Sequence, residues 1–221
     1  MRPWKLLEIW DLIIVQRDKF FSIWSSLHGD VPVTGIVKGW LSISYAVVRP
    51  LHRLRVTPNV LTTLGLIAAI ATWPTATTWL APALLVLSLL CDGLDGSLAM
   101  ISEKTSKRGA MIDSVVDRLS EVFWVLAFYR IGADVRILFF AAIFAFTQEY
   151  LRARAAGLGY SDITAVTIAE RPVRASLIFI ALIAFELKIQ LVSNFSVIWL
   201  GIQAVSLVYL SSVYFKRLQS H

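Results

Sequence analysis

The sequence has little of what holds a secreted or zinc-binding protein together. It contains one cysteine, Cys91, so an intrachain disulfide is excluded and the redox compartment stays open. Its three histidines, His28, His52 and His221, show no metal-ligand spacing and are expected at the surface. The stretch from Met1 to Asp18 carries charges of both signs and lacks a small-residue cleavage pattern. We therefore expect no cleaved signal peptide.

Charged residues are also scarce. They make up 16% of the 221 residues, against 57% hydrophobic residues, and the mean hydropathy is +0.69. This balance argues against an ordinary soluble globule. Lysine and arginine number 21 and aspartate and glutamate 15, an excess of six positive charges. Because the bases cluster beside apolar runs, we expect lipid headgroups and phosphate-bearing ligands as partners and no nucleic acid, although many bases could serve only as topology signals.

Six apolar stretches approach the roughly 20 residues that cross a membrane. Before them, residues 1–56 mix apolar and basic side chains as interfacial amphipathic helices do, with one such helix expected over 36–49. We therefore predict an all-α integral membrane protein, with N-terminal interfacial helices (1–56) followed by a domain of six transmembrane helices (57–221). A turn around Pro82 should join the first two spans, and a break near Asn194 the last two. The expected spans are 60–79, 82–101, 110–130, 135–152, 172–188 and 195–214.

Basic residues fall mainly on one side of these spans. The other side receives only Arg130, Arg136 and Lys188. The positive-inside rule therefore predicts that both termini face the cytoplasm. The residues on the basic side are Arg49, Arg53, Arg55, Lys104, Lys107, Arg108, Arg152, Arg154, Arg171, Arg174, Lys216 and Arg217.

Four aspartates at fixed spacing are the most informative feature of the chain. A carboxylate at membrane depth costs several kcal/mol at least, so it usually has a charge partner or a function there. Residues three and four apart share a helix face, so each pair of aspartates forms a stripe, and the short connection makes the two helices neighbours. Such hard oxygen ligands suit Mg²⁺ or Mn²⁺, and two ions would clamp the attacking and leaving oxygens of a phosphoryl transfer. The pattern is Asp92-x2-Asp95-Gly96-x2-Ala99, then Gly109-x3-Asp113-x3-Asp117.

Structural salt bridges are the alternative for these acids. Their partners would be Lys104, Lys107, Arg108 and Arg118. Two other acids in the predicted spans, Glu121 and Glu149, are expected to pair with Arg118 or Arg152.

The aspartate pattern resembles the signature of the CDP-alcohol phosphotransferases, Asp-x2-Asp-Gly-x2-Ala-Arg-x8-Gly-x3-Asp-x3-Asp. One position departs, because the arginine of the signature is Met100 here. Methionine cannot donate to a phosphate, so either Lys104, Lys107 or Arg108 replaces that contact or the activity is weakened. The six-span layout and the segment Thr57-Pro58-Asn59-x-Leu61-Thr62 are also similar to this family, so the resemblance covers most of residues 50–215.

The resemblance implies an enzyme that transfers a phosphatidyl group from CDP-diacylglycerol to an alcohol and releases CMP. By position, Asp92, Asp95 and Asp113 would hold two Mg²⁺ or Mn²⁺ ions. Asp117 would lie beside the second ion and act as general base. A homodimer in the bacterial plasma membrane, with its active site toward the cytoplasm, is also implied. The positions expected to bind the donor are Asn59, Thr62, Asp92, Gly96, Ala99, Lys104 and Arg108, although Asn59 and Thr62 could instead cap the first span.

Four further arginines flank one polar loop on the basic side: Arg152, Arg154, Arg171 and Arg174. Guanidinium forks match phosphate oxygens, so these residues could bind an acceptor with its own phosphate, or could only anchor the topology. The two segments are similar to those of actinobacterial phosphatidylinositol phosphate synthases, which implies inositol phosphate as acceptor. Glycerol 3-phosphate, the acceptor of phosphatidylglycerophosphate synthases, would satisfy the same electrostatics.

Two rival classes compete with the enzyme. An ion-coupled transporter also places acids within membrane helices, but it would carry polar groups at mid-membrane in several spans. A non-catalytic, lipid-binding relative is motivated by Met100.

Overall fold

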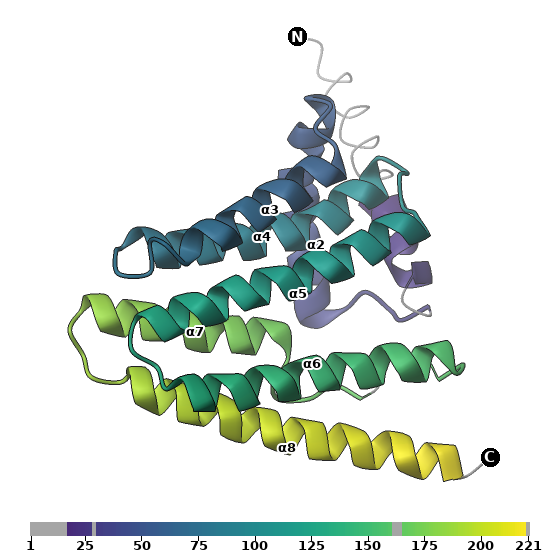
Figure 1. Ribbon diagram of the computed structural model, residues 1–221. Helices are drawn as coiled ribbons and strands as arrows, with labels where there is room; N and C mark the ends of the chain where they lie inside the picture. The colour runs from purple at the N-terminus through teal and green to yellow at the C-terminus, as the bar shows by residue number, and fades with distance from the viewer. Residues whose placement is uncertain (1–16, 28–29, 161–164, 220–221) are drawn as a thin grey trace. The chain divides into compact units, whose positions relative to one another are not determined.

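The computed structural model describes residues 17–27, 30–160 and 165–219, and every regular element in these ranges is helical (Figure 1). The predicted all-α class is therefore confirmed for the described residues. A helical segment at residues 17–27 precedes the labelled helices. These are α2 (Gly35–Arg53), α3 (Pro58–Thr72), α4 (Leu80–Ile101), α5 (Lys107–Arg130), α6 (Val135–Gly157), α7 (Arg171–Glu186) and α8 (Val192–Gln219). Residues 1–16, part of the predicted interfacial region, lie outside the described residues.

Two of the described helices are long and apolar enough to cross a membrane by themselves, α4 and residues Val192–Leu218 of α8. Val37–Arg53 and Pro58–Thr72 meet the same requirement together, but they are bent by 112° at their break, as in a broken span or a re-entrant loop. Two to three candidate spans therefore follow from length and composition. The other predicted spans coincide with helices that are shorter or more charged, so the count of six stays a prediction.

Two predicted connections lie elsewhere in the chain. Pro82 is in the first turn of α4, because a proline there removes only an N–H that has no partner within the helix. Asn194 is inside α8, because α7 already ends at Glu186 and Lys188 takes a left-handed backbone conformation with φ of 57°. The predicted break after Arg130 is confirmed, and Asp134 caps α6 by accepting a hydrogen bond from the backbone N–H of Arg136 at 2.7 Å.

The chain divides into two compact units, which are described separately. Unit 1 comprises residues 1–64 and 90–114, and unit 2 comprises residues 65–89 and 115–221. Helices α3, α4 and α5 each contribute residues to both units. The domain boundary predicted at residue 56 stays a prediction.

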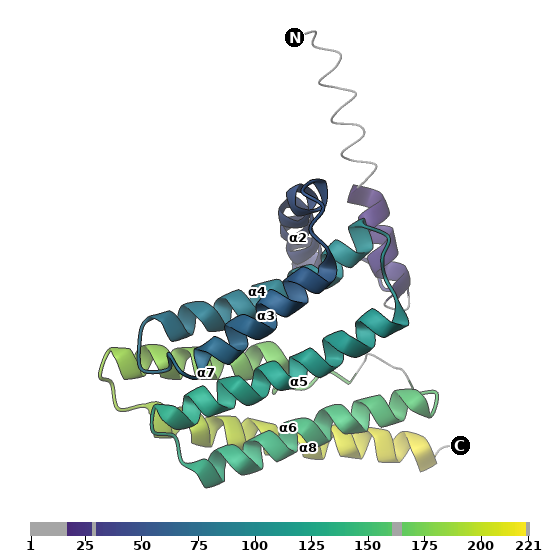
Figure 2. The same ribbon diagram turned by 45° about the horizontal axis from the view of Figure 1, so that its top comes forward.

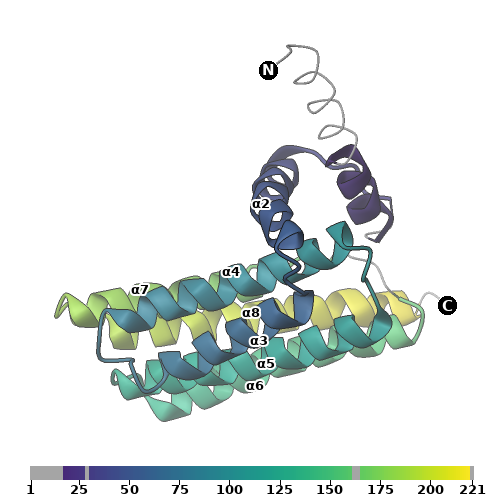
Figure 3. The same ribbon diagram turned by 90° about the horizontal axis from the view of Figure 1, so that it is seen from above.

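In unit 1, the segment 17–27 and α2 lie side by side (Figures 2 and 3) and are joined by aromatic packing. The rings of Phe20 and Tyr45 have centroids 5.5 Å apart. Both residues belong to a buried cluster that also includes Leu41 of α2 and Met100 of α4. A salt bridge of 2.5 Å from Lys19 to Glu103 also ties the segment 17–27 to the connection that follows α4.

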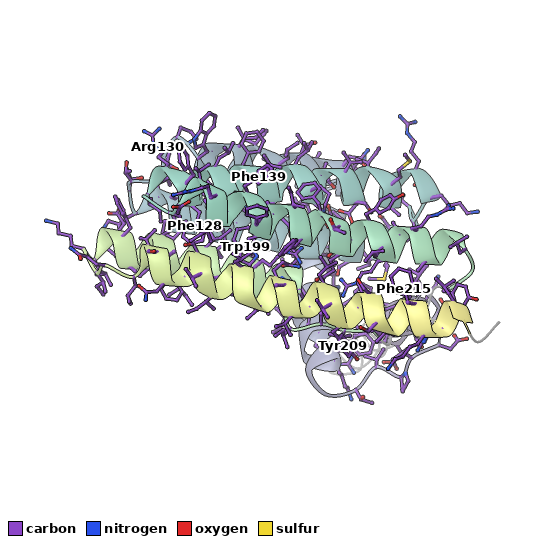
Figure 4. All side chains as sticks on the ribbon, turned by 60° about the horizontal axis from the view of Figure 1, so that its bottom comes forward. Phe128, Arg130, Phe139, Trp199, Tyr209 and Phe215 are labelled. Atoms are coloured by element: carbon purple, nitrogen blue, oxygen red, sulfur yellow. The ribbon has the colours of Figure 1, made fainter. Side chains whose placement is uncertain are left out.

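Unit 2 is built around small residues. Its α8 packs against both α6 and α7, and the rings of Phe128 and Trp199 stack at 6.4 Å at one end (Figure 4). Alanine at helix contacts lets backbones approach closely, which is how helices pack where water supplies no hydrophobic driving force. The buried alanines of this core are Ala69, Ala76, Ala81, Ala127, Ala133, Ala141, Ala175 and Ala181.

Candidate active site

Three aspartates of unit 1 come from two helices, α4 and α5. Asp92 of α4 and Asp113 of α5 have carboxylate oxygens within 4.8 Å of each other. Asp95 is 4% exposed and accepts a hydrogen bond of 2.5 Å from the hydroxyl of Thr62, on α3. The two predicted stripes therefore do meet within this unit.

Asp117 lies one turn beyond Asp113 on the same continuous helix, so the two carboxylates share a face of α5. Asp117 belongs to unit 2, where its Oδ1 is 2.9 Å from Nη1 of Arg171. The guanidinium of Arg171 also lies over the ring of Trp124, 5.2 Å from its centroid.

The ion pair between Arg171 and Asp117 was not predicted from the sequence. The salt-bridge alternative named other cations, and one of them, Arg118, lies instead 3.1 Å from Glu121. The only signal for Arg171 in the sequence was its place in the basic start of α7. Pairing across such a distance in the chain needs the fold.

The donor set around Asp92 and Asp113 consists of carboxylate oxygens, which are the ligands that Mg²⁺ and Mn²⁺ prefer. The described part of the chain brings no histidine or cysteine into this group. The residues present therefore fit a hard divalent cation.

A cavity of about 880 Å³ lies in unit 1 beside these acids. Its described lining includes Asp95 and Asp113 and five of the predicted donor-binding residues, and does not include Asp92 or Arg108. Because α3 begins at Pro58, Asn59 lies inside its first turn and Thr62 just beyond that turn. The Thr62 hydroxyl donates to Asp95 and to the Pro58 carbonyl. The capping alternative therefore does not describe Thr62. The five donor-binding residues that line the cavity are Asn59, Thr62, Gly96, Ala99 and Lys104.

In unit 2, Arg174 is 2% exposed and bound internally. Its Nε and Nη2 donate to Oε1 of Glu121 at 3.2 and 2.5 Å, and its Nη1 donates to the carbonyl of Ala169 at 2.6 Å. These bonds occupy each nitrogen of the guanidinium. Arg174 therefore joins α7 to α5 through buried hydrogen bonds to Glu121.

Arg152 of α6 holds the loop before α7. Its two terminal nitrogens donate to the carboxylate of Glu170 at 2.8 and 2.5 Å, and Nη1 lies 3.4 Å from Glu149. Burial by itself raises the pKa of Glu170, but hydrogen bonds from Arg152 and Thr167 outweigh it and hold the pKa below its usual value. The predicted pairings of Glu149 with Arg152 and of Glu121 with Arg118 are confirmed.

Of the four predicted acceptor arginines, Arg152 and Arg174 are thus hydrogen-bonded to glutamates of the chain itself. Arg171 contacts Asp117 at 2.9 Å and lies 3.9 Å from Glu121, and Arg154 is exposed near the end of α6. Their assignment to an acceptor phosphate stays a prediction.

Residues 55–209 match the family model of the CDP-alcohol phosphatidyltransferases, which is more than half of the chain. The chain therefore belongs to this family and is an enzyme of that class. Family membership and the two to three apolar helices indicate an integral membrane protein.

Two relatives are similar to most of the family domain of this chain. Over 160 residues the chain is 30% identical to phosphatidylinositol phosphate synthase of Cutibacterium acnes, covering 67% of this chain and 75% of the relative. Over 146 residues it is 37% identical to archaetidylinositol phosphate synthase of Pyrococcus horikoshii, covering 64% of this chain and 77% of the relative.

Solved structures show the same fold. The crystal structure of Mycobacterium tuberculosis phosphatidylinositol phosphate synthase with CDP-DAG bound gives a TM-score of 0.64 at 21% identity, over 79% of this chain and 94% of that chain. The same enzyme in complex with manganese and citrate gives 0.65 at 20% identity, over 78% and 88%.

Proposed function

We propose that this protein transfers the phosphatidyl group of CDP-diacylglycerol to a hydroxyl of a phosphorylated polyol, with inositol phosphate favoured, and releases CMP. The donor is supported by the family match and by the cavity beside the aspartates. Inositol phosphate is favoured over glycerol 3-phosphate because the two relatives named above are a phosphatidylinositol phosphate synthase and an archaetidylinositol phosphate synthase.

The metal ligands of the proposal are Asp92, Asp95, Asp113 and Asp117, holding two Mg²⁺ or Mn²⁺ ions. Bound cations would neutralise the donor diphosphate and polarise the phosphorus under attack. The hydroxyl of Thr62 fixes the orientation of Asp95. Lys104, which lines the cavity, replaces the arginine of the family signature as a phosphate contact, with Arg108 beside it.

The reaction forms a bond between the acceptor oxygen and the phosphatidyl phosphorus. The bond from that phosphorus to the bridging oxygen of CMP breaks, and CMP leaves with the electron pair. Asp117 takes the proton of the acceptor hydroxyl. Because Arg171 contacts Asp117 at 2.9 Å, a phosphate bound by Arg171 would bring the acceptor hydroxyl close to this base.

Among the arginines, we assign the direct phosphate contacts to Arg171 and Arg154. Arg152 and Arg174 support them, because each is already bonded to a glutamate. The protein would work as a homodimer with six spans in a bacterial plasma membrane, with this site toward the cytoplasm. The coincidence of α5, α6 and α7 with predicted spans supports the topology.

The observation that carries the proposal is the convergence of Asp92 and Asp113 from two helices of the family motif. The test incubates purified protein with CDP-diacylglycerol, Mg²⁺ and a panel of acceptors: inositol phosphate, glycerol 3-phosphate, inositol and serine. CMP and the lipid product are both measured. Wild-type protein is expected to release CMP with inositol phosphate, and an inactive wild type would favour the non-catalytic relative.

Replacing Asp113 or Asp117 by asparagine removes a charge but keeps the shape, so CMP release should fall at least about 100-fold while the protein stays folded. Asp134→Asn is the matched control, because Asp134 caps α6 far along the chain from the motif. Near-normal CMP release from Asp117→Asn would contradict the assignment of the base.

A further inference from the structure

The 880 Å³ cavity of unit 1 has two chemically different walls. One wall is polar and carries the acids and Lys104 described above. The other is entirely apolar and comes from the N-terminal elements. Its residues are Trp24 and Leu27 of the segment 17–27 and Trp40 and Leu41 of α2.

This apolar wall lies outside the family match, which begins at residue 55. The N-terminal elements that form this wall nevertheless contact α4, which carries the first half of the aspartate motif, and the connection after it. Leu41 packs in the buried cluster with Phe20, Tyr45 and Met100, and Lys19 binds Glu103 just beyond α4. The cavity is therefore lined partly by the family domain and partly by the N-terminal elements that precede it.

Met100 provides the contact through which the N-terminal elements pack on α4. It stands where the family signature has arginine, and it is 7% exposed because Phe20, Leu41 and Tyr45 cover it. An arginine here would place its charge among apolar side chains unless it extended into the cavity that Met100 also lines. The departure from the signature thus gives α4 an apolar surface for the N-terminal helices to cover.

Trp40 lies against the aspartate motif of α4. A Cβ added to Gly93 would lie 2.7 Å from Cζ2 of Trp40, so the indole ring rests against the backbone of α4 between Asp92 and Asp95. The side chain remains 41% exposed and lines the cavity. Gly93 therefore allows a flat aromatic surface beside the proposed metal ligands.

We propose that Trp24, Leu27, Trp40 and Leu41 bind the hydrocarbon part of the lipid donor, with Trp40 as a specificity-determining residue. This inference rests on the proposed function and names how the same site recognises its donor. An amphiphilic lipid nucleotide needs cations and hydrogen-bond donors at one end and apolar surface at the other. The cavity offers both, and the apolar wall has no cation for the phosphates.

Tryptophan fluorescence tests the contact without catalysis. CDP-diacylglycerol with brominated acyl chains, added in detergent, should quench wild-type fluorescence, and unbrominated CDP-diacylglycerol should reverse the quenching. Trp40→Phe should lose part of this reversible quenching. Trp79→Phe is the control, because Trp79 is exposed in the turn before α4 and should leave the quenching unchanged. Equal quenching in wild type and Trp40→Phe would overturn the inference.

Kinetics provide the second measurement. Trp40→Ala should raise the KM for CDP-diacylglycerol about tenfold, as loss of apolar pocket contacts does, with kcat and the inhibition constant of CMP almost unchanged. Gly93→Ala should show the same pattern, because its methyl group pushes the indole off α4. Equal weakening of CMP would assign Trp40 to the nucleotide and overturn the inference. If wild type releases no CMP with any acceptor, the proposed function fails, while the quenching experiment still reports on donor binding.

Discussion

Glu121 and Arg174 form a charge pair that is almost fully buried in unit 2, with side chains 8% and 2% exposed. Removing one partner of such a pair leaves a buried charge uncompensated, which costs about 3–5 kcal/mol. Glu121→Gln should therefore lower the free energy of unfolding by that amount, measured by denaturant titration in detergent. Arg136→Ala is the control, since it breaks an exposed pair of 3.5 Å with Asp134 and should leave the free energy of unfolding almost unchanged. Equal effects of the two substitutions would show that the buried pair has no special structural role.

Thr62 is the residue that tests the metal assignment without an activity assay. Its hydroxyl donates to Asp95 at 2.5 Å, and loss of such a support for a ligand weakens metal binding about 10–100-fold. Thr62→Val should therefore raise the Kd for Mn²⁺, followed by electron paramagnetic resonance, while Thr62→Ser should keep it. If both variants bind Mn²⁺ as tightly as wild type, Asp95 is not a ligand.

Glu170 holds residues 165–170, which precede α7, by accepting hydrogen bonds from Arg152 and from the N–H of Thr167 at 2.7 Å. These bonds leave its folded pKa below the ordinary 4.5. A depressed carboxylate pKa adds stability that is fully present above the unfolded pKa and is lost as pH falls through the folded pKa. The midpoint of thermal unfolding should therefore fall below about pH 4.5 in wild type. In Glu170→Gln it should start lower at pH 7 and depend less on pH, and parallel curves for the two proteins would contradict this.

The helices themselves were predictable from sequence, because apolar runs of fixed length alternate with basic connections. The 36–49 helix, the break after Arg130 and the meeting of Asp92 with Asp113 all followed from such local patterns. Contacts between distant residues did not follow. Arg171 reaches Asp117 from another helix, and Met100 is covered by helices that a family signature does not include. No periodicity encodes such pairings, since each depends on which faces the folded helices bring together.

Large apolar side chains lie on the surface of both units, while half of the buried residues in the core cluster of unit 2 are alanines. In water, a surface with so many large apolar side chains would promote aggregation, whereas in lipid it meets chains of equal polarity. This distribution supports a membrane location independently of hydropathy. Exposed examples are Ile67, Leu87, Val115, Phe139, Phe140, Val205 and Val208.

Whether α6 crosses the membrane distinguishes the two to three spans indicated by length and composition from the six that we propose. This helix has 23 residues and is therefore about 35 Å long, enough for a hydrocarbon core of about 30 Å, although it carries several charges. If it crosses the membrane, Arg136 near its start and Gly157 at its end lie on opposite sides. The positive-inside rule predicts that Gly157 faces the cytoplasm.

Single cysteines test this arrangement, because Cys91→Ala gives a background without cysteine. In intact cells, a membrane-impermeant maleimide should label Arg136→Cys but not Gly157→Cys. In inverted vesicles the pattern should reverse, and detergent should expose both positions. Labelling of both cysteines from the same side would place α6 along the surface and rule out six spans. The reverse sidedness would keep the spans but put the aspartates on the outer face, where the chain would meet neither cytoplasmic CDP-diacylglycerol nor a phosphorylated polyol made inside the cell.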